Sequence, residues 1–206
     1  SVCIHVRGGD TAAETSNRPI IRGNFCSAGG ASAYGIELGA FGGAAVKGPV
    51  VANNSIIATA THYGGISLSS AGPGGTVTGN HYNGSGFVGT LYGIEIAACD
   101  SVSITGNTLV GGTATVGGIV LLGSEDCIVS GNVVDGWDGD STSAGIYVGD
   151  SAATTNDKNV IIGNRVLASA SAALKGIWLQ SNHASATLRD TLIANNIIEG
   201  TSTAQG

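Results

Sequence analysis

The chain has 206 residues, a net charge of −6, only 11 % charged residues, and 35 glycines against three prolines. Hydrophobic residues make up 42 % of it, which excludes a disordered chain, since disorder needs low hydrophobicity and high charge. Eight scattered basic residues disfavour nucleic acid as a partner, and the apolar runs are too short to insert into a membrane.

An asparagine recurs along the chain as the second residue of a Gly-Asn or Asn-Asn pair. The seven pairs are Gly23-Asn24, Asn53-Asn54, Gly79-Asn80, Gly106-Asn107, Gly131-Asn132, Gly163-Asn164 and Asn195-Asn196. Successive pairs are 25 to 32 residues apart. A repeat of this length indicates a solenoid of stacked coils.

A second marker, Gly-Ile followed by a variable residue and an apolar one, lies between these pairs. It occurs at 35–38, 65–68, 93–96, 118–121, 145–148 and 176–179. Its two apolar residues have the period of a strand, so they face the core while the variable residue between them faces outward. No segment shows the apolar period of a helix.

Each coil therefore reads as three short strands: one at the Gly-Ile marker, one that ends at the Asn pair, and a third after it. We expect the seven asparagines to form a column in which amides bond from coil to coil. We also expect positive φ at the bend, which Asn tolerates. The prediction is one all-β domain over 1–206, a single-stranded right-handed parallel β-helix of about seven coils. It has no cap at either end, which indicates a fragment of a longer chain.

The pattern Val-x-Ile-x-Gly-Asn-x-Leu at 102–109, followed by Gly-Ile-x-Leu at 118–121, resembles the right-handed parallel β-helix proteins of the pectin-lyase-like superfamily. The resemblance covers essentially the whole chain. It implies binding or processing of acidic or capsular polysaccharide, as in pectate lyases, polygalacturonases, epimerases and bacteriophage tailspikes. The paired Asp motifs of polygalacturonases and the clustered Asp residues of pectate lyases are missing here.

The outward position of the first strand gives one row of side chains along the stack. The row is His5, Glu37, Ser67, Glu95, Val120, Tyr147 and Trp178. Glu37 and Glu95 are two coils apart, which is ~9.6 Å between backbones. Inverting glycosidases place their carboxyls ~6.5–9.5 Å apart, so we take this pair as catalytic candidates, one as proton donor and the other as base. The alternative is two solvated charges on a polar face.

Most of the scarce aromatic residues gather along the same edge. Tyr147 and Trp178 are neighbours in the row and can stack on the apolar faces of sugars. The loop 134–141 carries Trp137 and Asp138 beside them, and Tyr92 lies just before its strand. We expect these five residues to contact substrate, although ordinary cross-strand packing also explains the aromatics. Asp135, Asp138 and Asp140 could hold Ca²⁺, but a solvated loop is preferred, and no metal or cofactor is predicted.

The second strand has an outward row that is largely apolar. Its apolar members are Ile20, Val50, Ile128, Val160 and Leu192. An exposed apolar stripe marks a contact surface, so a homotrimer packed through this row is one hypothesis. The alternative is that β-propensity alone fills the strand with branched residues.

The four cysteines show no metal-binding spacing. By phase, Cys26 and Cys127 point into the core, where a free thiol acts as a small apolar side chain. Free thiols predict folding in a reducing compartment, which favours a virion protein assembled in the cytoplasm.

Together these features favour a polysaccharide-binding β-helix of a tailspike-like, receptor-binding protein on a virion tail, with hydrolase or lyase activity left open. One alternative is a bacterial lyase, hydrolase or epimerase that is secreted or held at the cell surface. A second alternative is a structural or adhesin solenoid without an active site.

Overall fold

A computed structural model describes residues 2–8, 16–29, 34–40, 45–59, 63–71, 73–85, 92–111, 117–137, 143–149, 154–168, 175–181 and 186–200. All regular secondary structure in these ranges is β. Within the same ranges no helix is long and apolar enough to cross a membrane.

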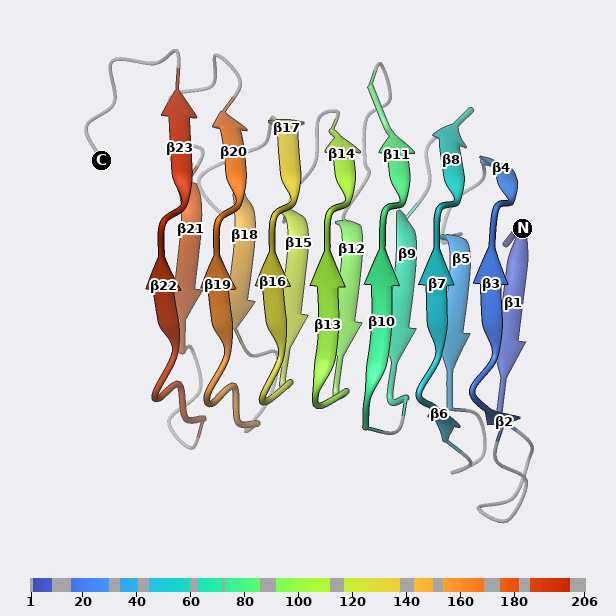
Figure 1. The fold of residues 1–206 in the computed structure, drawn as a ribbon, viewed down its shortest axis with the longest axis horizontal. Coiled ribbons are helices and arrows are strands. Elements are labelled where there is room, and N and C mark those ends of the chain that lie inside the picture. The colour runs from blue at the N-terminus through green and yellow to red at the C-terminus, as the bar shows by residue number, and fades with distance from the viewer. Residues whose placement is uncertain are drawn as a thin grey trace.

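The strands form three parallel sheets of seven strands each, and every coil adds one strand to each sheet (Figure 1). The first sheet holds β1 (Ile4–Arg7), β5 (Tyr34–Gly39), β9 (Gly64–Ser69), β12 (Tyr92–Ala97), β15 (Gly117–Leu122), β18 (Ala144–Gly149) and β21 (Lys175–Gln180). The second holds β3 (Ile20–Arg22), β7 (Val50–Ala52), β10 (Gly75–Thr78), β13 (Val102–Thr105), β16 (Ile128–Ser130), β19 (Val160–Ile162) and β22 (Leu192–Ala194). The third holds β4 (Phe25–Ala28), β8 (Ser55–Ala58), β11 (His81–Asn83), β14 (Thr108–Val110), β17 (Val133–Trp137), β20 (Arg165–Ala168) and β23 (Ile197–Gly200).

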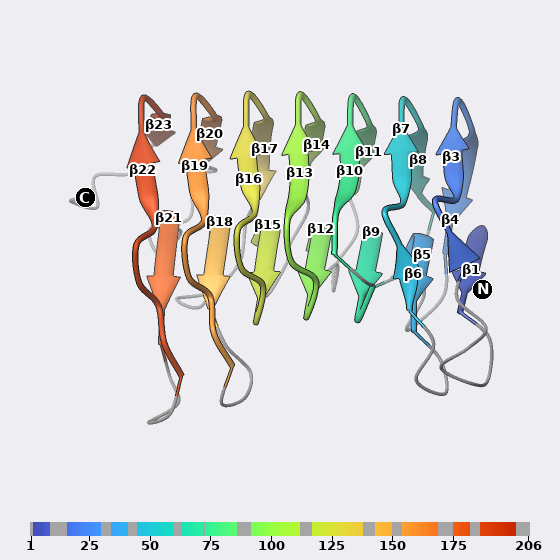
Figure 2. The ribbon, with the colours of Figure 1, turned by 60° about the horizontal axis from the view of Figure 1, so that its bottom comes forward.

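Successive coils lie directly on one another along the long axis, from β1, β3 and β4 at one end to β21, β22 and β23 at the other (Figure 2). A short extra pair, β2 (Ser16–Asn17) with β6 (Val46–Lys47), joins the first two coils beside the stack. The predicted all-β parallel solenoid is therefore confirmed, while its right-handed sense stays a prediction.

The core lies inside the coils and is filled by the inward residues of all three sheets. The Gly-Ile markers stack in register, so that Ile36, Ile66 and Ile94 are neighbours and are fully buried. Burying each such side chain contributes about 1.5–3 kcal/mol relative to leaving it exposed, so the repeated pattern itself drives the stacking.

The seven predicted asparagines form an unbroken column. Each Nδ2 donates to the Oδ1 of the next asparagine at 2.9–3.0 Å, from Asn24 through Asn54, Asn80, Asn107, Asn132 and Asn164 to Asn196. The same Oδ1 atoms also accept a bond from a backbone N–H of the coil below. The column satisfies polar groups that are otherwise costly to bury, so this prediction is confirmed.

Positive φ falls on the residue before each column asparagine. Gly106 has φ 62° and Asn53 has φ 53°, and the other five coils follow the same pattern. The expected positive φ at the bend is therefore present, and it falls on the first residue of the pair and not on the column asparagine. Two demands are thus separated: the first residue of the pair makes the left-handed corner, which Gly and Asn tolerate, and the second supplies the amide.

The glycine of the Gly-Ile marker is required by packing. A Cβ on Gly118 would lie 2.3 Å from Cγ1 of Val134, and one on Gly145 would lie 2.2 Å from Cγ1 of Val166. In each case the obstructing group is a core side chain from the third strand of the same coil. The marker therefore pairs a glycine with a bulky side chain across the corner of the coil.

The apolar outward row of the second sheet is exposed in part. Ile20, Ile128 and Leu192 are exposed, and Val50 and Val160 are half-buried. A homotrimer that packs through this row stays a prediction.

Replacing Asn107 with alanine tests the column at its centre. The change removes Oδ1 of Asn107, which accepts hydrogen bonds from the backbone N–H and the Nδ2 of Asn80, and it removes the Nδ2 that donates to the Val77 carbonyl. Each buried polar group left without a partner costs about 1–3 kcal/mol. We expect a loss of about 3 kcal/mol in urea unfolding. The matched control is Asn24→Ala at the end of the column, where no asparagine donates to the lost oxygen, and its cost should be about 1 kcal/mol or less. Equal losses in the two variants would contradict a cooperative column.

Candidate functional site

The outer face of the first sheet carries the row predicted from the sequence. The register pairs His5 with Glu37, Glu37 with Ser67, and Ser67 with Glu95. It continues from Glu95 through Val120 and Tyr147 to Trp178. The face thus brings residues from seven separate segments onto one line along the stack.

Glu95 is the centre of a hydrogen-bonded cluster on this face. Its Oε2 accepts a bond from the Tyr34 hydroxyl at 2.7 Å and one from the Ser67 hydroxyl at 2.9 Å. Tyr34 is 61 residues away in sequence and reaches across the intervening strand, β9. Two donors at one oxygen fix the orientation of the carboxylate, and hydrogen bonds to a charged acceptor are the stronger kind.

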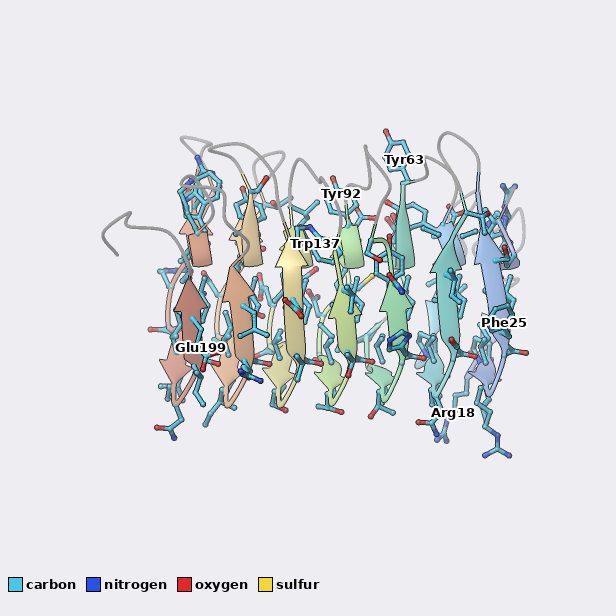
Figure 3. The ribbon with its side chains drawn as sticks, turned by 90° about the horizontal axis from the view of Figure 1, so that it is seen from above. Arg18, Phe25, Tyr63, Tyr92, Trp137 and Glu199 are labelled. Carbon is cyan, nitrogen blue, oxygen red and sulfur yellow. The ribbon has the colours of Figure 1, made fainter. Side chains whose placement is uncertain are left out.

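Three tyrosines, Tyr34, Tyr63 and Tyr92, lie at the edge of this face where the strands begin. The rings of Tyr34 and Tyr63 lie 5.9 Å apart, and Figure 3 shows Tyr63 and Tyr92 along the same edge. Burial and the charge of Glu95 hold the pKa of Tyr34 well above its ordinary value. Burial, followed by the charges of Glu95, Tyr63 and Tyr147, raises the pKa of Tyr92 to about 12. The phenols of Tyr34 and Tyr92 therefore stay neutral across the physiological range of pH.

Glu37 lies in a different environment. Its Oε2 is 3.9 Å from Nε2 of His5, and both side chains are partly exposed. Arg7 Nε donates to the same His5 nitrogen at 2.8 Å, so this nitrogen lies between the Arg7 guanidinium and the Glu37 carboxylate. The two carboxylates named as catalytic candidates thus share one face and have unlike neighbours.

Tyr147 and Trp178 are in contact, as adjacency in the row requires. Their ring centroids are 5.3 Å apart at 62°, and Lys175 Nζ lies 3.6 Å from the centroid of the Trp178 ring. Tyr147 is only 7 % exposed, in a small apolar cluster with Val120 and Ala144 that Tyr92, Leu122 and Trp178 border. The half-buried Trp178 is consequently the more accessible aromatic of the pair.

Trp137 does not lie on this face. A bulge between Asp135 and Trp137, with Gly136 at φ 64°, turns the indole into the coil. There it is fully buried, with its ring 6.0 Å from that of Tyr82. The expectation that Trp137 contacts a glycan is therefore wrong. Asp138 and Asp140 lie outside the described residues, and Asp135 is half-buried on β17.

Sequence reasoning missed the partnership between Tyr34 and Glu95. The available signal was the tyrosine that precedes the marker strand in three consecutive coils, Tyr34, Tyr63 and Tyr92. Only one of these hydroxyls reaches the carboxylate across two coils, and that depends on side-chain conformation.

A model of the family described as periplasmic copper-binding protein (NosD) matches residues 11–206. The chain belongs to the NosD family. No curated protein and no solved structure matches it. The family description does not support a place on a virion tail, and membership of the pectin-lyase-like superfamily is not confirmed.

The described residues do not fit the copper in the name of the NosD family. Within the described ranges, no group of three or more His, Cys, Asp and Glu side chains gathers where it could hold a metal ion. Burial raises the pKa of the Cys99 thiol to about 12 and that of Cys127 to about 11, which opposes the thiolate that a metal needs. Cys3 lies outside the matched residues.

The raised pKa of Tyr92 predicts how stability depends on pH. Below its ordinary value of 10 the phenol is neutral in both states and its contribution is complete. Above pH 10 the unfolded chain ionises first, so stability falls as pH rises toward about 12. The absorbance difference between wild type and Tyr92→Phe should show one tyrosine titrating near 12, and Glu95→Gln should lower that pKa. Titration near 10 would contradict the burial of Tyr92 beside Glu95.

Proposed function

We propose that this NosD-family chain is a polysaccharide-binding β-solenoid that acts outside the cytoplasm, and that the outer face of its first sheet is the binding face. The observation that carries the proposal is the continuous line on that face, in which the Tyr34–Ser67–Glu95 cluster is followed by Tyr147 and Trp178.

The chemistry of the line suits a linear sugar polymer. Carboxylate and phenol groups exchange hydrogen bonds with sugar hydroxyls, while the Trp178 ring offers an apolar surface to the face of a sugar ring. The line runs across successive strands spaced ~4.8 Å apart. Glu37, Glu95 and Trp178 are partly exposed along it, whereas Ser67, Val120 and Tyr147 are buried and support their neighbours. A polymer laid along the stack would therefore meet the three partly exposed side chains.

Hydrolysis is the reaction that the two carboxylates could perform on such a polymer. Glu95, oriented by two hydroxyl donors, is suited to activate water, and Glu37, two strands away, would protonate the leaving oxygen. A backbone separation of ~9.6 Å leaves room for the water.

The family description favours the secreted bacterial alternative over the tailspike. Both a periplasmic protein and a tailspike would be expected to bind glycans, and the two alternatives differ in where the protein acts. A scaffold without a ligand is the remaining alternative, and the next two experiments separate it from the proposal.

Trp178→Ala tests binding to a panel of capsular and plant polysaccharides by affinity electrophoresis. We expect a loss of about tenfold in affinity, equivalent to about 1.4 kcal/mol, because a stacking surface is removed. Phe25→Ala is the matched control, since Phe25 is a 69 % exposed aromatic on β4 in the third sheet. Equal losses in both variants, or no binding by wild type to any polymer, would sink the proposed face.

Glu95→Gln and Glu37→Gln test depolymerisation, measured as new reducing ends with the polymer that binds. Each change should lower the rate about 10²–10⁴-fold, the usual contribution of a general acid or base. Glu199→Gln is the control, because Glu199 is an exposed carboxylate on β23 of the third sheet, paired with Arg165 and off the row. Binding without any new reducing ends in wild type would leave a non-catalytic binding module.

A further inference from the structure

The first coil departs from the glycine rule of the other six. Ile4 pairs with Ile36, so the residue before it, Cys3, occupies the marker position that is Gly35 in the second coil. The side chain across the corner from that position is a core residue of the third strand, such as Ile56 opposite Gly35. In the first coil the corresponding residue is Cys26, which pairs with Ile56 in the third sheet.

The other coils show how close two such side chains are. A Cβ built on Gly145 lies 3.4 Å from Cβ of Val166, which occupies in its coil the position that Cys26 occupies in the first. Disulfide-bonded cysteines have Cβ atoms about 3.5–4.5 Å apart. At this corner a side chain at the glycine position would clash with a valine or isoleucine on the third strand. The same short Cβ–Cβ distance suits two cysteines joined by a disulfide.

The contacts of the two thiols agree with this placement. Cys3 Sγ donates to the Ser27 carbonyl at 3.1 Å, next to Cys26 in the chain. Burial, and then the neighbouring Cys3, raises the pKa of the Cys26 thiol to about 11. Cys3 is exposed while Cys26 is 3 % exposed, so an oxidant reaches Cys3 first.

We propose that Cys3 and Cys26, both thiols in this structure, are joined as a disulfide by exchange with a small-molecule or protein disulfide. The Cys3 thiolate attacks the oxidant's S–S bond and releases one thiol. The Cys26 thiolate then attacks the mixed disulfide and releases the second. Two S–H bonds are lost, one S–S bond forms, and the oxidant leaves as two thiols.

The bond would fasten β1 to β4 and so secure the outermost strand of the first sheet. β1 carries His5 and Arg7, the groups beside Glu37 at that end of the row. Closing a ring in the chain also restricts the unfolded state, which stabilises the fold. Disulfides persist in oxidising compartments, which agrees with the periplasmic description of the family and replaces the expectation of a reducing one.

The test is to count thiols in the full 206-residue chain before and after exposure to oxidised glutathione. Samples are alkylated with N-ethylmaleimide under denaturing conditions. Their intact mass is measured by mass spectrometry, and they are then digested without reduction for peptide mapping. Wild type should lose two of its four adducts and the mass of two hydrogen atoms, and should yield a peptide that joins Cys3 to Cys26. The oxidised protein should also melt at a higher temperature than the reduced one.

Two variants make the outcome decisive. Cys127→Ala should still form the bond and retain one adduct, whereas Cys3→Ala should retain all three of its adducts and show no rise in melting temperature on oxidation. Four adducts in oxidised wild type, a glutathione that remains on Cys3, or a link that includes Cys99 or Cys127 would each overturn the proposal.

Discussion

The column of hydrogen-bonded asparagines is the interaction on which the rest of this structure depends. Each amide ties one coil to the next at a single place in the repeat, and a slip of one residue would turn every inward side chain outward. With that place fixed, the buried isoleucines stack, the marker glycines meet the bulky residues across the corner, and the outward rows run straight. The loops can therefore vary in length without disturbing the sheets.

The candidate site is a product of this stacking. Tyr34, Ser67 and Glu95 come from three coils and meet only because β5, β9 and β12 are in register. Nothing local in any one segment makes the cluster. The same holds for Tyr147 and Trp178 on β18 and β21. A face assembled in this way changes by substitution in single coils, so one solenoid can carry different outer faces.

The sequence was sufficient for the fold because a repeat constrains itself: seven phased asparagines and six phased markers leave one consistent stacking. The site was less predictable. Simple alternation along β17 predicts that Trp137 points outward. A bulge at Gly136 turns its indole inward instead, and no period in the sequence reveals such a bulge. Tyr34 was visible at the correct edge, but its reach to Glu95 depends on side-chain conformation. The proposed Cys3–Cys26 disulfide rests on the spacing at the corner of the coil, which no period in the sequence reveals.

The most direct test of the account is a double-mutant cycle between Tyr34→Phe and Glu95→Ala, measured by urea unfolding. Stacking in the proposed register places the two side chains in a hydrogen bond at 2.7 Å across 61 residues of sequence. A bond to a charged group predicts a coupling energy of about 1.5–3 kcal/mol. Additive effects, within about 0.5 kcal/mol, would mean that the coils do not bring these residues together and that the proposed face does not exist.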